Sequence, residues 1–331
     1  MQQKKLNRRN FLRASAASSL GLLAVHPLLQ SCKPTTTTTI AAAPAGEVVE
    51  DTVFRSAGAV DRKQFGVGLQ LYSIRDSMAA DALGSLKKVS DIGYKYVELA
   101  DYANRKFYGY APADFKKVLT DLGLEAMSSH TQVEAAGITV DNAKVMADDH
   151  AALGVKYCVQ PWLEEPDRTI EKYKRMMTDW NKIGEIMKGV GIQFAYHNHN
   201  FEFLPTDGIV PYYDIFLKEL QPDLVTMEID LYWVTKAGQD AIEMFNKYPG
   251  RFKLWHFKDQ LAPAAPIYTV EKEDIAPVGG GRINFNRIYA ARELAGMQNF
   301  FVEDDNQAEN YGGPFAGIER SINSLTTKIL V

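Results

Sequence analysis

The segment "IQFAYHNHNFEF" (residues 192–203) joins a short apolar run to a cluster of polar side chains. Its first half is rich in β-branched and aromatic residues, which is typical of a buried strand. Two histidines, two asparagines and a glutamate follow within a few residues. The segment therefore predicts a strand whose end carries side chains suited to binding or catalysis.

Seven further apolar runs resemble this one, and segments of helix length separate them. The predicted strands cover residues 65–73, 95–100, 124–130, 156–162, 192–199, 224–231, 252–259 and 299–305. The predicted helices cover residues 81–91, 113–122, 142–153, 168–189, 212–220, 239–247, 284–295 and 315–327. Strands that alternate with helices form parallel sheets, and eight repeats in order predict an α/β fold with a single (β/α)8 TIM barrel over residues 65–331.

Four helices end at a glycine that is followed by an apolar residue, namely Gly93, Gly123, Gly154 and Gly191. Glycine adopts the left-handed conformation that terminates helices. These positions support the predicted boundaries between each helix and the next strand.

Residues 1–32 have the layout of an export signal, with a basic start, an apolar middle and small residues near the end. "NRRNFLR" (residues 7–13) resembles a twin-arginine motif, carried by Arg8 and Arg9, and "LLQSC" resembles a lipoprotein box that ends at Cys32. The low-complexity residues 33–64 predict a flexible linker. We expect an exported protein of the periplasm or cell envelope that contacts the membrane only through a lipid anchor on Cys32.

The net charge of −4 and the lack of a long basic run give no indication of a nucleic-acid partner. The chain has two cysteines, and lipidation of Cys32 would leave Cys158 without a disulfide partner. The core must then hold the fold together. The sequence does not determine the oligomeric state.

Polar residues gather where the predicted strands end, and four of the six histidines lie there. In TIM barrels the carboxyl ends of the strands form the active site. Because side chains alternate along a strand, His197 and His199 share a face, as do Glu228 and Asp230, and His256 and Lys258. Imidazoles and carboxylates from consecutive strands form a mixed set that suits a divalent ion such as Mn²⁺, Zn²⁺, Co²⁺ or Mg²⁺.

The order "H-N-H-x-x-E-F", "E-x-D-x-x-W", "W-H-x-K-D" and "V-E-D-D" resembles the xylose isomerase-like barrel family of sugar isomerases and epimerases. The resemblance spans residues 65–325, and "PVGGGRINF" (residues 277–285) is similar to a family segment before the seventh helix. It implies a small carbohydrate substrate. It also implies four metal ligands, which are His197, Asp230, His256 and Glu303.

The sequence departs from the ketose 3-epimerase branch at His197, where those enzymes are expected to have a metal-bound glutamate. A second base would then be Glu202 or a histidine. The predicted chemistry is proton removal beside a carbonyl to give an enediolate, with Glu303 or Glu202 as base and Lys258 beside the developing oxyanion.

Other polar and aromatic residues near the strand ends are predicted to bind substrate, with Trp and Tyr rings stacking on a sugar. They are Tyr72, Glu98, His130, Gln160, Trp162, His199, Trp233 and Lys258.

Structural roles stay open for several of these residues. His197 and His199 could be core histidines that bond to backbone carbonyls, and Glu228 could pair with an arginine while Asp230 binds the metal. Lys258 could bridge to Asp259. Glu98 and His130 could hydrogen-bond only to each other, and the glycines at residues 279–281 predict a flexible loop rather than a phosphate cradle.

Three functions follow from this pattern. The first is a metal-dependent sugar isomerase or epimerase that acts on a free sugar or keto-sugar. The second is a lyase or hydrolase of 3-keto-glycosides that expels the glycosidic group from an enediolate. The third is a sugar-binding lipoprotein without catalytic activity.

Overall fold

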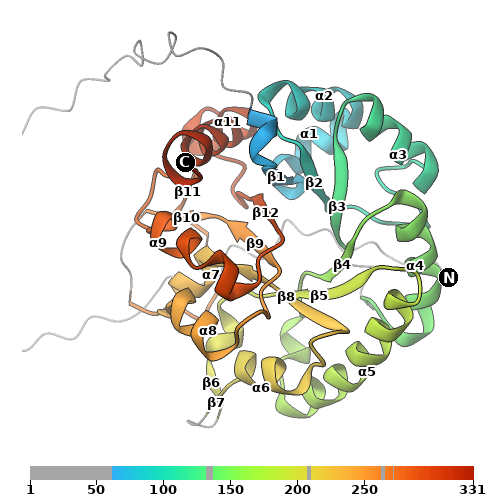
Figure 1. Cartoon of the computed structure of the whole chain (residues 1–331), viewed down its shortest axis with the longest axis vertical. Helices are drawn as coiled ribbons and strands as arrows, with labels where there is room; N and C mark the ends of the chain where they lie inside the picture. The colour runs from blue at the N-terminus through green and yellow to red at the C-terminus, as the bar shows by residue number, and fades with distance from the viewer. Residues whose placement is uncertain (1–61, 132–136, 207–209, 262–264, 271) are drawn as a thin grey trace, which may run out of the picture. The chain divides into compact units, whose positions relative to one another are not determined.

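Eight parallel strands close into a barrel in the computed structural model, which describes residues 62–331 except 132–136, 207–209, 262–264 and 271 (Figure 1). Around the barrel the strands follow the order β1, β12, β9, β8, β5, β4, β3 and β2. Their bounds are β1 Gly68–Gln70, β2 Tyr96–Leu99, β3 Glu125–His130, β4 Tyr157–Gln160, β5 Gln193–His197, β8 Val225–Asp230, β9 Leu254–Phe257 and β12 Asn299–Val302. This arrangement confirms the predicted TIM barrel.

Helices surround the ring of strands, as Figure 1 shows. The longer ones are α2 Ala82–Ile92, α3 Pro112–Asp121, α4 Val140–Leu153, α5 Ile170–Lys188, α6 Tyr212–Glu219, α8 Ala241–Lys247 and α11 Pro314–Ser324. All seven lie within a few residues of a predicted helix. The predicted helix 284–295 consists of two short helices, α9 Phe285–Ala290 and α10 Arg292–Ala295.

The helix ends have the predicted chemistry. Gly93 and Gly154 cap α2 and α4 with φ angles of 109° and 100°, in the left-handed region that side chains with a Cβ rarely adopt. At its other end α4 begins with a capping box between Thr139 and Asn142. Local sequence therefore determines where these helices start and stop.

The strands separate two apolar layers. Tyr157, Val159, Ala195, Leu254 and Phe301 form a cluster of their own, while the strand residues next to them in the sequence belong to the large cluster that includes helix residues. This split follows from the alternation of side chains along a strand. The small cluster fills the amino-terminal part of the barrel, and the polar residues lie above it, toward the carboxyl ends.

Several short elements follow the strands directly and are absent from the predicted set. They are α1 Arg75–Ala80, α7 Leu231–Lys236, and the two-stranded pairs β6 Pro205–Thr206 with β7 Val210–Pro211 and β10 Asp259–Gln260 with β11 Ile275–Ala276. Asp230 ends β8 and caps α7 by accepting from the Trp233 backbone N–H. Elements of two to six residues are too short to show a periodic pattern.

The predicted export signal, the twin-arginine motif, Cys32 and nearly all of the predicted linker lie outside the described residues. Among the helices that the structure describes, none combines the length and the apolar character that a membrane span requires.

Candidate metal centre and active site

The four predicted metal ligands lie together at the carboxyl-terminal mouth of the barrel. They are His197 at the end of β5, Asp230 at the end of β8, His256 in β9 and Glu303 directly after β12. One nitrogen or oxygen atom from each lies within 4.8 Å of the corresponding atoms of the other three. We call these four residues the mouth group.

The mouth group is held by contacts between its own members. His256 Nδ1 lies 2.9 Å from Glu303 Oε2 and 3.9 Å from Asp230 Oδ2, and His197 Nε2 lies 3.5 Å from the same Asp230 oxygen. Burial raises the pKa of both carboxyl groups, but Lys258 and the histidines outweigh this effect and lower it. Both side chains are therefore carboxylates at neutral pH.

Two buried ring nitrogens of the mouth group have no hydrogen-bond partner in the part of the chain that the structure describes. Both belong to His197, which lies beside Asp230 Oδ2, an oxygen that also faces His256 and the Lys258 ammonium. Buried polar atoms in native proteins are nearly always paired, so two unused ring nitrogens beside buried carboxylates need an explanation. Two imidazoles and two carboxylates are a suitable donor set for a divalent transition metal. The residues present therefore fit a metal ion.

Lys258, which follows β9, lies beside the mouth group and is almost fully buried. Its ammonium nitrogen is 3.0 Å from Asp230, 2.7 Å from Glu303 and 2.6 Å from Asp305. Burial lowers the pKa of Lys258, but the three carboxylates reverse this and raise it well above its usual value. The alternative in which Lys258 bridges to Asp259 is wrong.

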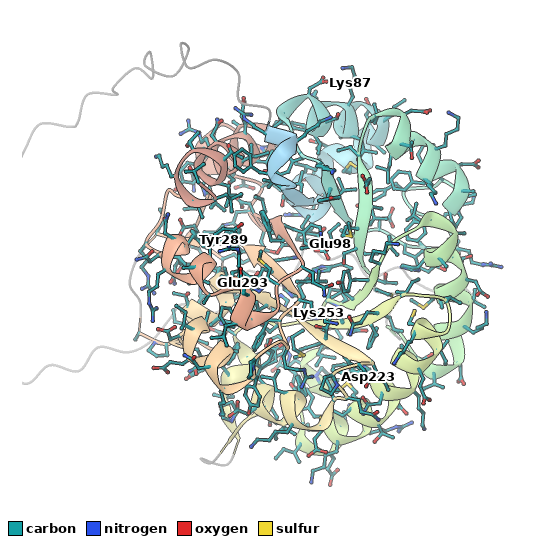
Figure 2. The ribbon with its side chains drawn as sticks, viewed as in Figure 1. Lys87, Glu98, Asp223, Lys253, Tyr289 and Glu293 are labelled. Atoms are coloured by element: carbon teal, nitrogen blue, oxygen red, sulfur yellow. The ribbon has the colours of Figure 1, made fainter. Side chains whose placement is uncertain are left out.

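A second polar layer lies beneath the mouth group. Gln70, Glu98, His130 and Glu228 form it, on strands β1, β2, β3 and β8, and we call these four residues the floor. In Figure 2 Glu98 lies inside the ring of strands. All four are buried. His130 and Glu228 also form, with His197 and His256, a second group whose atoms could hold a metal ion.

The floor joins its acids to imidazoles. His130 Nε2 lies 2.5 Å from Glu228 Oε2 and 3.3 Å from Glu98 Oε2. The Glu98 oxygen also lies 2.6 Å from His256 Nε2. Burial lowers the pKa of His130 and His256, but the carboxylates overcome this and raise it. The Glu228 carboxylate contacts His130 and His256, so the alternative that it pairs with an arginine is wrong. Glu98 and His130 are in contact but do not bond only to each other.

Aromatic residues form one wall of the mouth. The His199 ring centre lies 4.8 Å from that of Trp162, 5.1 Å from that of Trp233 and 5.0 Å from that of His197. His199 Nδ1 and Trp233 Nε1 are buried and have no hydrogen-bond partner among the residues that the structure describes. Burial lowers the pKa of His199, so its ring is neutral at neutral pH. These two nitrogens are available to a ligand beside the mouth group.

Three predicted site residues are not brought into this cluster. The Glu202 carboxylate bonds to the Tyr196 hydroxyl and the His199 backbone N–H, and Tyr196 packs against Trp180 of the helix layer. Gln160 braces the segments after β3 and β4 through Ile138 and Trp162. Tyr72 lies at the rim, 36 % exposed, next to Arg75 and Lys272. Burial raises the pKa of Glu202 to about 7.

The glycine segment at residues 279–281 is tied to a carboxylate. Asp259 accepts hydrogen bonds from the backbone N–H groups of Gly279, Gly281 and Ile283, at 2.9 to 3.1 Å, and from that of Gln260. The N–H groups that could cradle a phosphate are thus already used. The segment is anchored, which differs from the flexible loop that its composition predicts.

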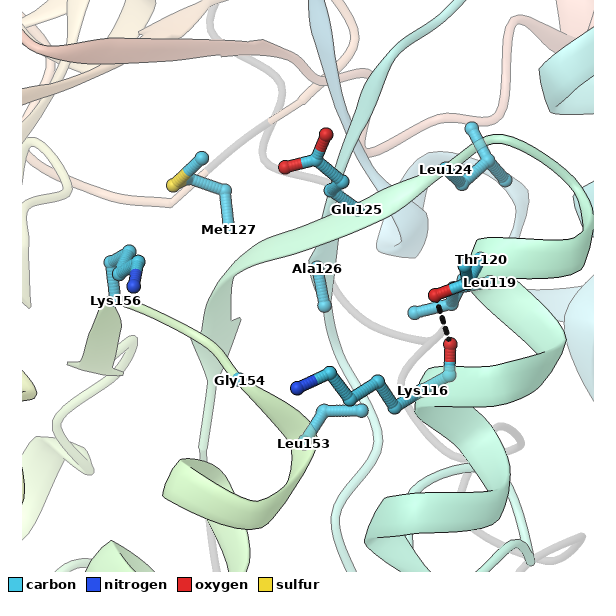
Figure 3. A pocket seen from close by; sticks show the side chains of 10 residues that line it. All are labelled: Lys116, Leu119, Thr120, Leu124, Glu125, Ala126, Met127, Leu153, Gly154 and Lys156. Atoms are coloured by element: carbon cyan, nitrogen blue, oxygen red, sulfur yellow. Dashed lines mark hydrogen bonds between the residues drawn. The ribbon is translucent and has the colours of Figure 1, made fainter.

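A cavity of about 130 Å³ lies at the opposite end of the barrel (Figure 3). It is lined by residues at the start of β3 and the ends of α3 and α4, among them Lys116, Glu125 and Lys156. Active sites of TIM barrels form at the carboxyl ends of the strands, so we do not assign this cavity to the chemistry.

The sequence matches the profile described as "Xylose isomerase-like TIM barrel" over residues 86–326, which is most of the chain. The protein belongs to this family. The closed eight-stranded barrel is the fold that the description of this family names.

Two relatives show the range of names in this family. An inosose dehydratase of Lacticaseibacillus casei is 25% identical over 161 residues, which are 46% of this chain and 53% of that protein. The chain thus spans about half the length of the curated relatives it matches. A sugar phosphate isomerase/epimerase structure from Parabacteroides distasonis is 29% identical with a TM-score of 0.67, and the match covers 82% of this chain and 96% of that one.

A third likeness concerns the fold alone. The structure of an IolI protein "with a binding zinc atom" is 15% identical with a TM-score of 0.62, over 80% of this chain and 98% of that chain.

Asp305 and Gln70 are the neighbours of the site that sequence reasoning gave no role. Asp305 pairs with Lys258, and Gln70 donates to Glu98. Both lie at predicted strand ends, which is the signal that could have found them. Their partners are known only from the contacts between neighbouring strands.

Proposed function

We propose that this protein is a metal-dependent lyase that removes a proton beside the carbonyl of a keto-sugar or keto-cyclitol and eliminates a β-substituent as water or an alcohol. The inosose dehydratase relatives support elimination chemistry, although they match only part of the chain. The donor chemistry of the mouth group supports the metal. A divalent ion held by His197, Asp230, His256 and Glu303 would polarise the substrate carbonyl.

The observation that carries elimination is the placement of an acid and a base side by side. The Glu303 carboxylate and the Lys258 ammonium are 2.7 Å apart at the mouth. Glu303 can remove the proton next to the carbonyl, which leaves the electron pair to form the C=C bond as the β C–O bond breaks. Lys258 can give its proton to the departing oxygen. An acid and a base on one side of the substrate suit a syn elimination.

Epimerisation places a different demand on the site, because a proton must leave one face of the carbon and return to the other. Glu202 was the candidate for the second base, but its carboxylate bonds to Tyr196 and the His199 backbone. A second base would have to be His199, whose neutral ring has a nitrogen without a hydrogen-bond partner in the described segments. Isomerisation or epimerisation is the second candidate function, and the likeness to a sugar phosphate isomerase/epimerase favours it.

The charges at the mouth favour an uncharged substrate. Lys258 and Lys272 both pair with Asp305, and Lys258 also contacts Asp230 and Glu303. A phosphate group would have to compete with these carboxylates for the same ammonium groups. The aromatic wall of Trp162, His199 and Trp233 suits the apolar face of a neutral ring instead.

The test is to incubate the protein loaded with Mn²⁺, Co²⁺ or Zn²⁺ with keto-cyclitols, 3-keto-glycosides and ketoses, and to follow products by NMR and ultraviolet absorbance in D₂O. We expect an unsaturated ketone, with water or the aglycone released. Glu303→Gln and Lys258→Met should each reduce turnover by about 100-fold or more, as expected for loss of a proton-transfer group. Deuterium in an isomer or epimer without elimination would favour the second candidate. Turnover of none of the substrates would contradict both.

Export to the cell envelope is also a proposal, which rests on the sequence of residues 1–32. Fractionation of cells that make the full chain, beside an Arg8→Lys, Arg9→Lys variant, tests it. We expect the variant to accumulate in the cytoplasm. Equal distribution of the two proteins would contradict the proposal.

A further inference from the structure

His256 faces two layers of the barrel with its two ring nitrogens. Nδ1 points toward the mouth group, 2.9 Å from Glu303 and 3.9 Å from Asp230. Nε2 points toward the floor, 2.6 Å from Glu98 Oε2 and 3.4 Å from Glu228 Oε2. Only one of these nitrogens can carry the lone pair that binds a metal, and the other must keep its proton.

The hydrogen bonds of the floor determine which ring nitrogen of His256 keeps its proton. The Gln70 side-chain oxygen accepts from the Tyr72 backbone N–H, so the amide group of Gln70 has a fixed orientation. Its NH₂ group therefore donates to Glu98 Oε2 over 2.8 Å. An oxygen that accepts from Gln70 is positioned to accept from His256 Nε2–H as well.

We propose that Glu98 is a positioning residue that holds the proton of His256 on Nε2 and so presents the Nδ1 lone pair to a metal in the mouth group. This inference rests on the proposed metal site and changes the predicted role of Glu98, which was substrate binding. Carboxylates that accept from the second nitrogen of a ligand histidine fix its tautomer and ring orientation. Glu98 is fully buried under His256, which suits this role and not contact with a substrate.

The same geometry distinguishes two substitutions of Glu98. In Glu98→Gln the amide oxygen can still accept from both Gln70 and His256, because the fixed Gln70 amide requires an acceptor at that place. In Glu98→Met the acceptor is lost while the unbranched side chain fills similar space. The first variant should keep the His256 tautomer, and the second should release it.

The experiment measures Zn²⁺ affinity by competition with a chelator for wild type, Glu98→Gln and Glu98→Met. Loss of a partner that orients a ligand typically weakens metal binding by about 10–100-fold. We expect this loss for Glu98→Met and a change below about tenfold for Glu98→Gln. Asp149→Asn is the control, because Asp149 is a buried carboxylate that pairs with Arg105 and Tyr102 instead of the mouth group. Its affinity should equal that of wild type.

A spectroscopic readout keeps the proposal testable if Glu98→Met does not fold. The ¹⁵N chemical shifts of the histidine ring nitrogens in Zn²⁺-loaded wild type should show His256 with a proton on Nε2 and the metal on Nδ1. Zinc bound through Nε2 would overturn the proposal, as would equal affinity in wild type and a folded Glu98→Met.

Two outcomes separate this inference from the proposed function. If wild type binds no zinc, the metal site itself fails, and the inference fails with it. If wild type binds two zinc ions per chain and Glu98→Met binds one, Glu98 is a ligand of a second ion in the floor, and only the positioning role is overturned.

Discussion

Two buried histidines, His150 and His197, differ in how many hydrogen bonds their ring nitrogens make. His150 lies in α4, where Nδ1 bonds to the Met146 carbonyl and Nε2 to the Thr131 hydroxyl. His197 lies at the end of β5, and within the described part of the chain neither of its ring nitrogens has a hydrogen-bond partner. Both rings are almost fully enclosed, so burial does not distinguish them. The two histidines differ in their hydrogen bonds, because both nitrogens of His150 are bonded and those of His197 are not. The unbonded nitrogens of His197 indicate a position where a ligand could bind.

Two aspartates repeat this contrast. Asp259 accepts backbone N–H groups with both oxygens and serves as an anchor for the glycine segment. Asp230 accepts from the backbone with Oδ1 only, while Oδ2 faces Lys258 at 3.0 Å and two histidines at 3.5 and 3.9 Å. A carboxylate bonded only to the backbone stabilises the fold, whereas one that faces charged and metal-binding side chains is available for chemistry.

The largest expected effect is on metal binding. His197→Ala should lower the affinity for Mn²⁺, Co²⁺ or Zn²⁺ by more than about 100-fold, because loss of a ligand exceeds the usual 10–100-fold effect of an outer partner. His150→Ala should keep the metal and lose only stability. Elemental analysis and chelator competition on both variants measure the difference. Equal metal content in the two variants would remove the distinction between these histidines.

The second effect concerns Lys258. Lys258→Met removes the ammonium group that contacts the buried carboxylates of Asp230, Glu303 and Asp305, and leaves only Lys272 beside Asp305. Removing one partner from a buried charge cluster typically costs 3–5 kcal/mol, and we expect about that loss in urea unfolding with EDTA present.

A bound metal adds positive charge at the same place, so added Mn²⁺ should recover part of the stability that Lys258→Met loses. If Mn²⁺ does not restore any of the stability that Lys258→Met loses, Lys258 does not act at the metal site.

The smallest effect is a pH dependence from His150. Burial lowers the pKa of this ring from 6.5 to about 4, so between these values the unfolded chain binds more protons than the folded chain. The free energy of unfolding should therefore fall as the pH drops from 6.5 to 4, by about 3 kcal/mol from this group. Urea unfolding of wild type and His150→Gln across this range isolates the contribution. Identical slopes in the two proteins would contradict it.

The strands and most helices could be predicted because their signals are local. The run before His197 predicted β5, and Gly154 predicted the end of α4. The same alternation of side chains that placed His197 and His256 on the inner face also explains why Gln160 lies outside the site. Gln160 has the parity of Cys158, which packs in the layer between strands and helices, so it does not point into the barrel.

Residues beyond the strand ends were harder to place. Glu202 lies in a 3-10 helix, Phe201–Phe203, where the period of two no longer applies. Its carboxylate turns back to Tyr196, one residue before the predicted ligand His197. Composition marked Glu202 as a candidate base, but its direction depends on a turn that has no strong local signal.

The sequence by itself determined the barrel, the family and the type of donor at each strand end, because strand order and a period of two determine which side chains converge at the mouth. Only the tertiary structure decided the partners within that cluster. Glu98 and His256 are 158 positions apart, and Lys258 and Asp305, which follow the neighbouring strands β9 and β12, are 47 positions apart. Such pairings depend on distances that exist only once the barrel has closed, and so no local pattern encodes them.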